Sequence, residues 1–171
     1  MEHNTTKSRR AFLYQLSLAG LSIPLAASTF ADEQKQTTMQ QKKEGKLGIA
    51  LVGLGGYAGG QLAPALQQTE HCYLAGIVTG TPSKIPVWKE KYNIPDKNIY
   101  NYDNYDSIKD NPDIDIIYVV LPNSMHAEYV IRGFAAGKHV ICEKPMALTV
   151  ADCDKMIAAA KKAGKQLSVG Y

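Results

Sequence analysis

The sequence is poor in cysteine and carries little net charge, and each deficit excludes a class of protein. Its three cysteines, Cys72, Cys142 and Cys153, are too few and too widely spaced for a disulfide framework or a CxxC metal site. Each is therefore predicted to be a small buried apolar residue, and no metal centre is expected. Without the first 31 residues, 16 basic residues face 15 acidic ones. This balance gives no support to a nucleic-acid or anionic-membrane surface.

The stretch from Lys46 to Leu66 predicts a strand, a tight turn and a helix, because an apolar run ends at glycines and a helical pattern follows. Gly53, Gly55 and Ala58 fit the G-x-G-x-x-G/A dinucleotide fingerprint. The first glycine permits a turn with positive φ, the second lets a pyrophosphate approach the backbone, and the alanine keeps the helix close to the strand. The stretch therefore predicts a nucleotide site at a helix N-terminus. On these residues alone, a glycine-rich turn of another βαβ unit stays open.

Strand and helix patterns alternate along the rest of the chain, which predicts an α/β fold with a doubly wound parallel sheet of order 3-2-1-4-5-6. The further predicted strands are 73–78, 99–100, 115–121, 139–142 and 167–170, and the further predicted helices are 82–92, 102–110, 124–136 and 150–163. Thr149 and Asp152 form a capping-box-like helix start, and Gly137 and Gly164 end the last two helices. Pro64 should kink the first helix or mark the end of a tight first segment, because proline lacks a backbone donor.

The first 31 residues are predicted to be a targeting segment. The run 8–13 (SRRAFL) resembles the twin-arginine export signal S-R-R-x-F-L, and an uncharged apolar run follows as far as Phe30. An uncleaved membrane anchor is the alternative. Twin-arginine export carries folded proteins, which suits a protein that acquires a nucleotide in the cytoplasm and works in the periplasm. Residues 32–45 are predicted to be a flexible linker and residues 46–171 a nucleotide-binding domain.

The end of the second predicted strand lacks the carboxylate that NAD-binding units place there for the ribose hydroxyls. The chain instead reads VTGTPSK over residues 78–84, with hydroxyls and a lysine that favour a 2′-phosphate. This pattern favours NADP over NAD, with Thr79 and Lys84 as the phosphate contacts. A second interpretation, compatible with the first, is that Thr81 caps the next helix and Pro82 is its first residue.

Two more polar clusters follow predicted strands and are expected in the same cleft, because ligands bind outside the carboxyl ends of parallel strands. One comprises Pro122, Asn123 and His126, and the other contains Glu143 and Lys144. His126 by itself is more typical of a hydrogen-bonded structural histidine than of a catalyst. Lys144 is predicted to orient or polarise a substrate hydroxyl, with a solvated loop lysine as the alternative.

Three segments carry a resemblance to the Gfo/Idh/MocA oxidoreductases: VGLGGYAGG, LPNSMHAEYVIRGFAAGKHVICEKPMALTVADC and LSVGY. Within this family they are most similar to the periplasmic glucose–fructose oxidoreductase type. The resemblance implies a Rossmann domain of a nicotinamide-dependent sugar or polyol oxidoreductase, with Lys144 at the active centre. The cofactor-binding residues it implies are Gly53, Leu54, Gly55, Gly56, Tyr57, Thr79, Lys84, Leu121, Pro122, Asn123, His126, Glu143 and Lys144. Gly56 departs from the pattern, because the similar type has a basic residue there.

Family members continue beyond the G-Y at the end of this sequence into an α+β domain that supplies the substrate pocket and the oligomer sheet. The resemblance therefore implies that this chain is a cofactor domain with an incomplete active site, inactive by itself. A homo-oligomer is expected only with that second domain, and the twin-arginine machinery is the expected export partner. Two other functions stay open: an exported NAD-dependent glycosidase of a related family, and a non-catalytic nucleotide-binding module.

Overall fold

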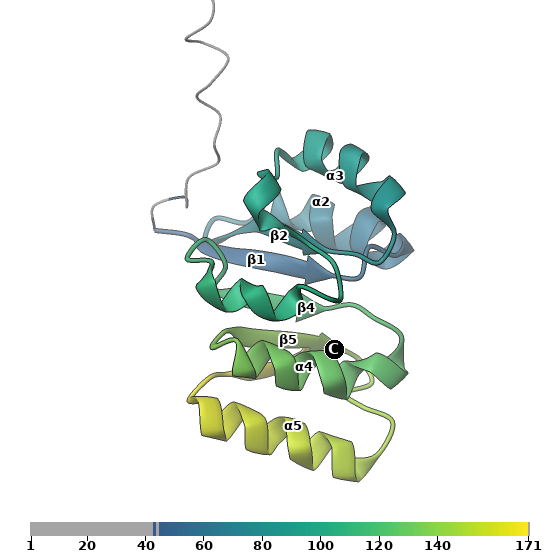
Figure 1. Cartoon of the computed structure of the whole chain (residues 1–171), viewed down its shortest axis with the longest axis vertical. Coiled ribbons are helices and arrows are strands. Elements are labelled where there is room, and N and C mark those ends of the chain that lie inside the picture. The colour runs from purple at the N-terminus through teal and green to yellow at the C-terminus, as the bar shows by residue number, and fades with distance from the viewer. Residues whose placement is uncertain (1–42, 44, 171) are drawn as a thin grey trace, which may run out of the picture. The chain divides into compact units, whose positions relative to one another are not determined.

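The computed structural model describes residue 43 and residues 45–170, which form a parallel sheet with helices on its faces (Figure 1). The strand order is β3-β2-β1-β4-β5-β6, which confirms the predicted doubly wound topology. The strands are β1 (Leu47–Val52), β2 (Cys72–Val78), β3 (Ile99–Tyr100), β4 (Ile116–Val119), β5 (His139–Glu143) and β6 (Leu167–Gly170). The predicted targeting segment and all of the predicted linker except Lys43 and Gly45 lie outside the described residues.

The helices begin and end close to where the sequence predicts them. They are α2 (Ala63–Leu66), α3 (Ile85–Tyr92), α4 (His126–Ala135) and α5 (Val150–Ala163), and η5 (Tyr105–Asp110) is a 3₁₀ helix in the predicted span 102–110. The helices predicted from residues 82 and 124 begin with short 3₁₀ turns, η3 (Pro82–Lys84) and η6 (Asn123–Met125), as is common at helix N-termini. A third such turn, η4 (Asp96–Asn98), precedes β3. Within the described residues, no helix is long and apolar enough to cross a membrane.

The ends of the last two long helices follow their sequence signals. The Thr149 hydroxyl accepts a hydrogen bond from the Asp152 backbone N–H at 3.1 Å, which satisfies one of the free donors at the start of α5. Gly137 and Gly164 follow α4 and α5 with φ of +73° and +62°. Glycine takes this left-handed conformation without the strain that a Cβ imposes.

The first helix accommodates Pro64 through a wider turn before it. Residues Ala58–Leu62 form the π-helical turn η2, and the Ala63 N–H bonds to the Ala58 carbonyl, five residues back. In a regular α-helix, Pro64 would lack a donor and its ring would crowd the carbonyl four residues earlier. The extra residue in the π turn changes this register, so the helix continues through α2 as a bulged rather than a broken element.

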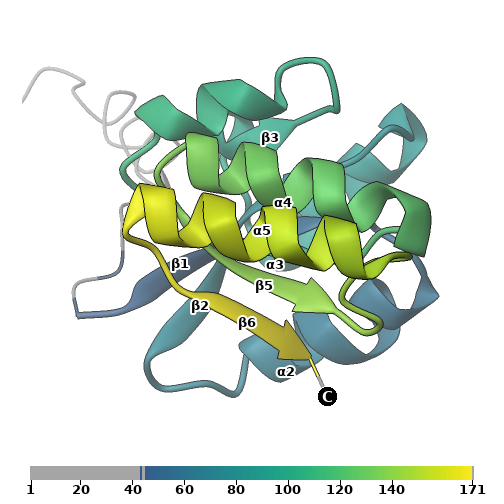
Figure 2. The same ribbon diagram turned by 90° about the horizontal axis from the view of Figure 1, so that it is seen from below.

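The two halves of the sheet differ in how their faces are covered. One face carries η5, α4 and α5, with α4 and α5 side by side over β5 and β6 (Figure 2). The other face is packed by α2 and α3 against β1 and β2, whose residues are buried on both faces from Ile49 and Tyr73 onward. In β4 and β5 burial instead alternates, so Tyr118 and Glu143 face a partly open surface.

Burial of the cysteines is only partly as predicted. Cys142 in β5 is fully buried, and burial raises the pKa of its thiol to about 12. Cys72 and Cys153 are partly exposed, so the prediction is wrong for them. The reason is position: Cys72 is the first residue of β2, and Cys153 lies in the first turn of α5, before the first buried residue of that helix, Met156.

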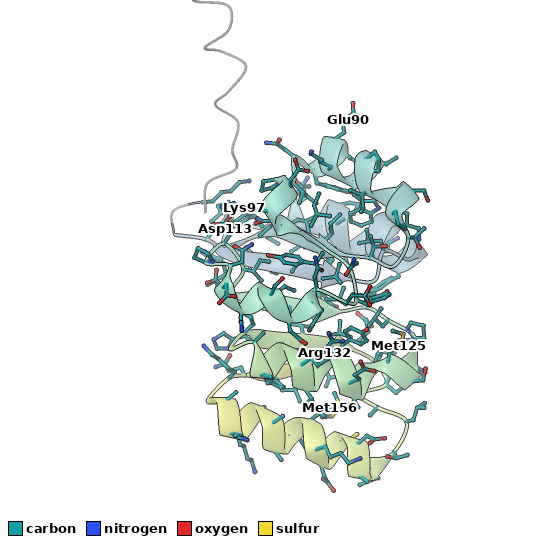
Figure 3. All side chains as sticks on the ribbon, viewed as in Figure 1. Glu90, Lys97, Asp113, Met125, Arg132 and Met156 are labelled. Carbon is teal, nitrogen blue, oxygen red and sulfur yellow. The ribbon has the colours of Figure 1, made fainter. Side chains whose placement is uncertain are left out.

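A buried polar network joins the loops at the end of the sheet where the strands begin. The Asp113 carboxylate, 5% exposed, pairs with the Lys97 ammonium at 2.7 Å (Figure 3). Asn98 and Asn111 extend this network through a 2.7 Å hydrogen bond between their side chains. These groups satisfy one another's hydrogen-bonding capacity, so the network stabilises the fold. It lies at the edge of the sheet opposite the glycine loop, which follows the carboxyl end of β1.

Candidate functional site

The glycine loop after β1 makes the predicted tight turn. Gly53 has φ of +93°, and its N–H bonds to the Val78 carbonyl at 3.0 Å. A Cβ at Gly53 would lie 2.4 Å from the Val120 carbonyl oxygen, so a side chain cannot fit beside β4. At Gly55 and Gly56 an added Cβ would meet no atom within 4 Å. The turn is therefore closed toward the sheet and presents open backbone on its other side.

A pocket of about 630 Å³ opens beside this loop, at the carboxyl ends of β1, β4, β5 and β6. Its lining residues are Gly55, Gly56, Tyr57, Ala58, Tyr118, Val120, Leu121, Glu143, Lys144 and Gly170. The pocket thus brings the glycine loop and the Glu143–Lys144 pair, which are far apart in sequence, to one cavity. Six of the predicted site residues line it: Gly55, Gly56, Tyr57, Leu121, Glu143 and Lys144.

The Glu143 carboxylate is held from two sides. The Tyr118 hydroxyl donates to Glu143 Oε1 at 2.6 Å, and the Lys144 backbone N–H donates to Oε2 at 3.2 Å. Burial and the adjacent carboxylate raise the pKa of the Tyr118 hydroxyl, so it stays a proton donor at neutral pH. Tyr118 is not among the site residues predicted from the sequence, although its hydroxyl is the only polar side-chain group in the otherwise aliphatic run IIYVVL.

Lys144 follows β5 directly and is exposed at the pocket. Among the described residues, its ammonium has no ion-pair partner. A primary ammonium with three N–H donors, at the same cavity as the glycine loop, can donate to a ligand oxygen and stabilise negative charge that develops there. The position of Lys144 is compatible with its predicted role, and the role itself stays a prediction.

His126 is fully buried, and it does not line the pocket. Its Nδ1 lies 2.8 Å from the Pro145 carbonyl oxygen and its Nε2 lies 2.9 Å from that of Leu121. The ring therefore links the segment after β4 to the segment that carries Lys144. These contacts are typical of a hydrogen-bonded structural histidine, and the cofactor contact implied by the family resemblance stays a prediction.

The residues predicted to contact a 2′-phosphate lie beside the glycine loop, outside the pocket lining. Thr79 is 4% exposed, and its hydroxyl oxygen accepts the Thr81 N–H at 3.1 Å. Lys84 Nζ donates to the Leu54 carbonyl at 2.7 Å, so this cation is tied to the loop. Thr81 holds the N-cap position before η3 as predicted, but its side chain makes no capping hydrogen bond.

The remaining predicted residues frame the site. Leu54 is buried in the core under α2 and α3, and Gly53 closes the turn. Pro122 and Asn123 are exposed after β4 and do not line the pocket. Within residue 43 and residues 45–170, no three His, Cys, Asp or Glu side chains gather into a metal-binding group.

The cavity fits a nicotinamide dinucleotide. Its volume lies in the range of small-molecule sites, about 300–1,000 Å³. Gly55 and Gly56 leave the backbone uncovered where a pyrophosphate would approach, and Lys144 and Glu143 lie in the same pocket near β5.

Comparisons with known proteins agree with this geometry. Residues 47–171 match the family model described as "Oxidoreductase family, NAD-binding Rossmann fold" (GFO_IDH_MocA). The crystal structure of aldose–aldose oxidoreductase from Caulobacter crescentus aligns with a TM-score of 0.73 and 53% identity over 74% of this chain and 38% of that one. Inositol 2-dehydrogenase of Salmonella typhimurium is 30% identical over 75% of this chain and 36% of its own length.

A third similar structure is a 3-ketoreductase from Actinomadura kijaniata in complex with TDP-benzene and NADP. It aligns with a TM-score of 0.66 and 23% identity over 74% of this chain and 38% of its own, which shows a shared fold. In these three alignments the chain spans 36–38% of the length of its relatives.

Proposed function

The chain belongs to the Gfo/Idh/MocA oxidoreductase family, and on this basis we propose that it is the cofactor domain of an NADP-dependent sugar or polyol oxidoreductase. The observation that carries the proposal is the single pocket shared by the open glycine loop and Lys144. The names of the similar aldose–aldose oxidoreductase and inositol 2-dehydrogenase support a polyhydroxylated substrate. Because the chain spans about a third of its relatives, we further propose that other parts of the whole protein hold this substrate and assemble the oligomer.

When bound, the nicotinamide supplies hydride exchange with a substrate carbon. The chain's own residues supply binding and polarisation. The backbone at Gly55 and Gly56 receives the pyrophosphate, because no side chain stands between the loop and a ligand. The Lys144 ammonium donates a hydrogen bond to the reacting oxygen of the sugar, which stabilises the negative charge that develops there.

The preference for NADP rests on the end of β2. No carboxylate lies between Thr79 and Lys84, so nothing in this segment repels a 2′-phosphate. The Lys84 ammonium keeps two of its three N–H donors after bonding to Leu54, and these remain for a phosphate oxygen.

A fluorescence titration of the full chain with NADPH and with NADH tests cofactor choice. We expect NADPH to bind more tightly, and Lys84→Met to weaken NADPH by about tenfold while leaving NADH nearly unchanged, because only NADPH carries the phosphate. Lys161→Met, in the last turn of α5, is the matched control. Tighter binding of NADH would refute the NADP preference, and no binding of either would refute the nucleotide function.

The role of Lys144 is tested by turnover in the whole protein with its substrate-binding part. Lys144→Ala should lower the rate of sugar oxidation by about 10²- to 10⁴-fold and leave NADPH affinity nearly intact, since the lysine acts on the reacting oxygen. An unchanged rate would exclude this role.

We also propose that the protein is exported by the twin-arginine pathway. The support is the run SRRAFL at residues 8–13 together with the apolar run that follows it. Replacing Arg9 and Arg10 by lysine should keep the protein in the cytoplasmic fraction of cells, whereas Lys7→Arg should not. Equal amounts of the arginine-substituted and unsubstituted proteins in the periplasmic fraction would refute the proposal.

A further inference from the structure

The fixed carboxylate of Glu143 gives the pocket a property beyond simple binding of a dinucleotide. Glu143 lines the cavity, and its two oxygens accept from two different elements, the Tyr118 hydroxyl on β4 and the Lys144 backbone N–H. A carboxylate held through both oxygens keeps one orientation, whereas a free glutamate at a strand end samples several.

Gly170 on β6 provides the space for this arrangement. It pairs with Glu143 in the sheet register, and a Cβ on Gly170 would lie 3.0 Å from Glu143 Oε1 and 3.1 Å from the Tyr118 hydroxyl oxygen. Three adjacent strands therefore define the position of one charge. Tyr118 on β4 donates the hydrogen bond, Glu143 at the end of β5 carries the carboxylate, and Gly170 on β6 leaves space for both side chains.

The Glu143 carboxylate is not paired with the ammonium of its neighbour in sequence. Within the described part of the chain, the Lys144 ammonium forms no ion pair with Glu143, and Lys144 is exposed where Glu143 is half-buried. A charge that is half-buried and fixed acts on a bound ligand more strongly than one that water screens fully.

We infer that Tyr118 is a positioning residue, whose hydroxyl fixes the Glu143 carboxylate in the pocket so that the pocket favours the oxidised, cationic nicotinamide over the reduced, neutral one. The inference rests on the proposed function, because it concerns how the same pocket distinguishes two redox forms of its cofactor. The two forms differ by one positive charge on the nicotinamide ring, and a nearby carboxylate stabilises the form that carries it.

The test measures the dissociation constants of NADP⁺ and NADPH for the full chain and compares their ratio among variants. Glu143→Gln removes the charge, so the preference for NADP⁺ over NADPH should fall by about tenfold, as expected for loss of one partly screened charge pair. Tyr118→Phe keeps the charge but removes its anchor, so the ratio should move part of the way in the same direction. Gly170→Ala, which crowds the pair without changing either group, should do likewise.

Tyr92→Phe is the matched control, because it also removes one buried tyrosine hydroxyl, and that hydroxyl has no hydrogen-bond partner among the described residues. A merely structural role for Tyr118 would weaken both cofactor forms equally and leave the ratio unchanged. An unchanged ratio in Tyr118→Phe, or one that shifts toward NADP⁺, would therefore overturn the inference. If the unsubstituted chain bound neither form, the proposed function itself would fail, and the inference with it.

A second measurement tests the hydrogen bond without any cofactor. Urea unfolding of Tyr118→Phe, Glu143→Gln and the double variant forms a thermodynamic cycle. Because a hydrogen bond to a charged group is stronger than a neutral one, the coupling should change the unfolding equilibrium constant by about tenfold. Additive effects of the two substitutions would show that the tyrosine does not hold the carboxylate.

Discussion

Substitution of Gly53 by alanine tests the structural role of the glycine loop, as distinct from its role in ligand binding. At Gly53 the residue has φ of +93°, and a Cβ would lie 2.4 Å from the Val120 carbonyl oxygen and 2.8 Å from Leu121 Cδ2. The left-handed backbone costs a non-glycine residue about 1–2 kcal/mol. Overpacking against Val120 and Leu121, just after β4, costs about 1–3 kcal/mol more. Gly53→Ala should therefore lower the free energy of unfolding by about 2–5 kcal/mol.

Gly55→Ala is the matched comparison, because the same methyl group would meet no atom within 4 Å. Its free energy of unfolding should stay within about 0.5 kcal/mol of the unsubstituted chain. Its affinity for NADPH should fall by about tenfold or more, since the methyl group occupies the surface that a pyrophosphate approaches.

Urea unfolding followed by Trp88 fluorescence, together with NADPH titration, measures both effects. Trp88 is buried in the core under α2 and α3, so its emission reports on folding. If Gly53→Ala were as stable as the unsubstituted chain, the explanation by backbone strain and crowding at Gly53 would be refuted. Equal losses of stability in the two variants would refute this explanation as well, because an added Cβ meets Val120 and Leu121 at Gly53 but no atom at Gly55.

Three further predictions concern stability and reactivity. His126→Ala should destabilise the chain by about 2–4 kcal/mol, because it removes a buried ring that lies within hydrogen-bond distance of two carbonyl oxygens and opens a cavity, as urea unfolding would show; a loss below about 0.5 kcal/mol would exclude the structural role. Alkylation followed by mass spectrometry should modify Cys72 and Cys153 well before Cys142, since burial raises the pKa of the Cys142 thiol to about 12, and early modification of Cys142 would contradict this. Hydrogen bonds from Lys155 and Thr149 lower the pKa of Asp152 in the folded state. The ionised carboxylate therefore stabilises the fold at pH values above the usual pKa of an aspartate, and this contribution is lost as the pH falls through the lowered pKa. Asp152→Asn should accordingly reduce the fall in melting temperature as the pH is lowered into the acid range. An unchanged dependence of melting temperature on pH would exclude this contribution of Asp152.

Much of the fold can be predicted from the sequence because its signals are local. Each buried strand is an apolar run, and turn or capping residues such as Gly53, Thr149 and Gly164 stand at the ends of elements. Because the six strands alternate with helices and parallel crossovers are right-handed, only a few sheet topologies are possible for this sequence. The glycine loop and Lys144 could be predicted to share a cleft for the same reason, since both follow strands at one edge of the sheet.

The parts that could not be predicted depend on contacts across strands. The hydrogen bond between Tyr118 and Glu143 requires the register of β4 with β5, and the room left by Gly170 requires β6 as well. Nothing in the local sequence sets that register. The position of Lys84 after β2 predicts a contact with a 2′-phosphate. The sequence does not indicate that the Lys84 ammonium also lies within hydrogen-bond distance of the Leu54 carbonyl.

The π turn before Pro64 illustrates a second limit. A proline inside a helical pattern predicts a kink or an end, because regular α-helical hydrogen bonding is assumed. Here the bond from Ala63 to Ala58 shifts the register first. Packing of the helix start on the sheet, with Ala58 fully buried, is a tertiary constraint that a local pattern does not contain.

The close approach of Gly53 to the segment after β4 also bears on how such sequences diverge. The residue is glycine because the Val120 carbonyl leaves no room for a side chain, so a descendant that no longer bound a nucleotide would still have to keep it. Gly55 stands over open space, so no residue of the described chain excludes a side chain there, whereas a bound pyrophosphate would. Among diverged copies of this fold, glycine at the position of Gly53 is therefore expected whether or not a nucleotide binds, whereas glycine at the position of Gly55 is expected only where selection for binding continues.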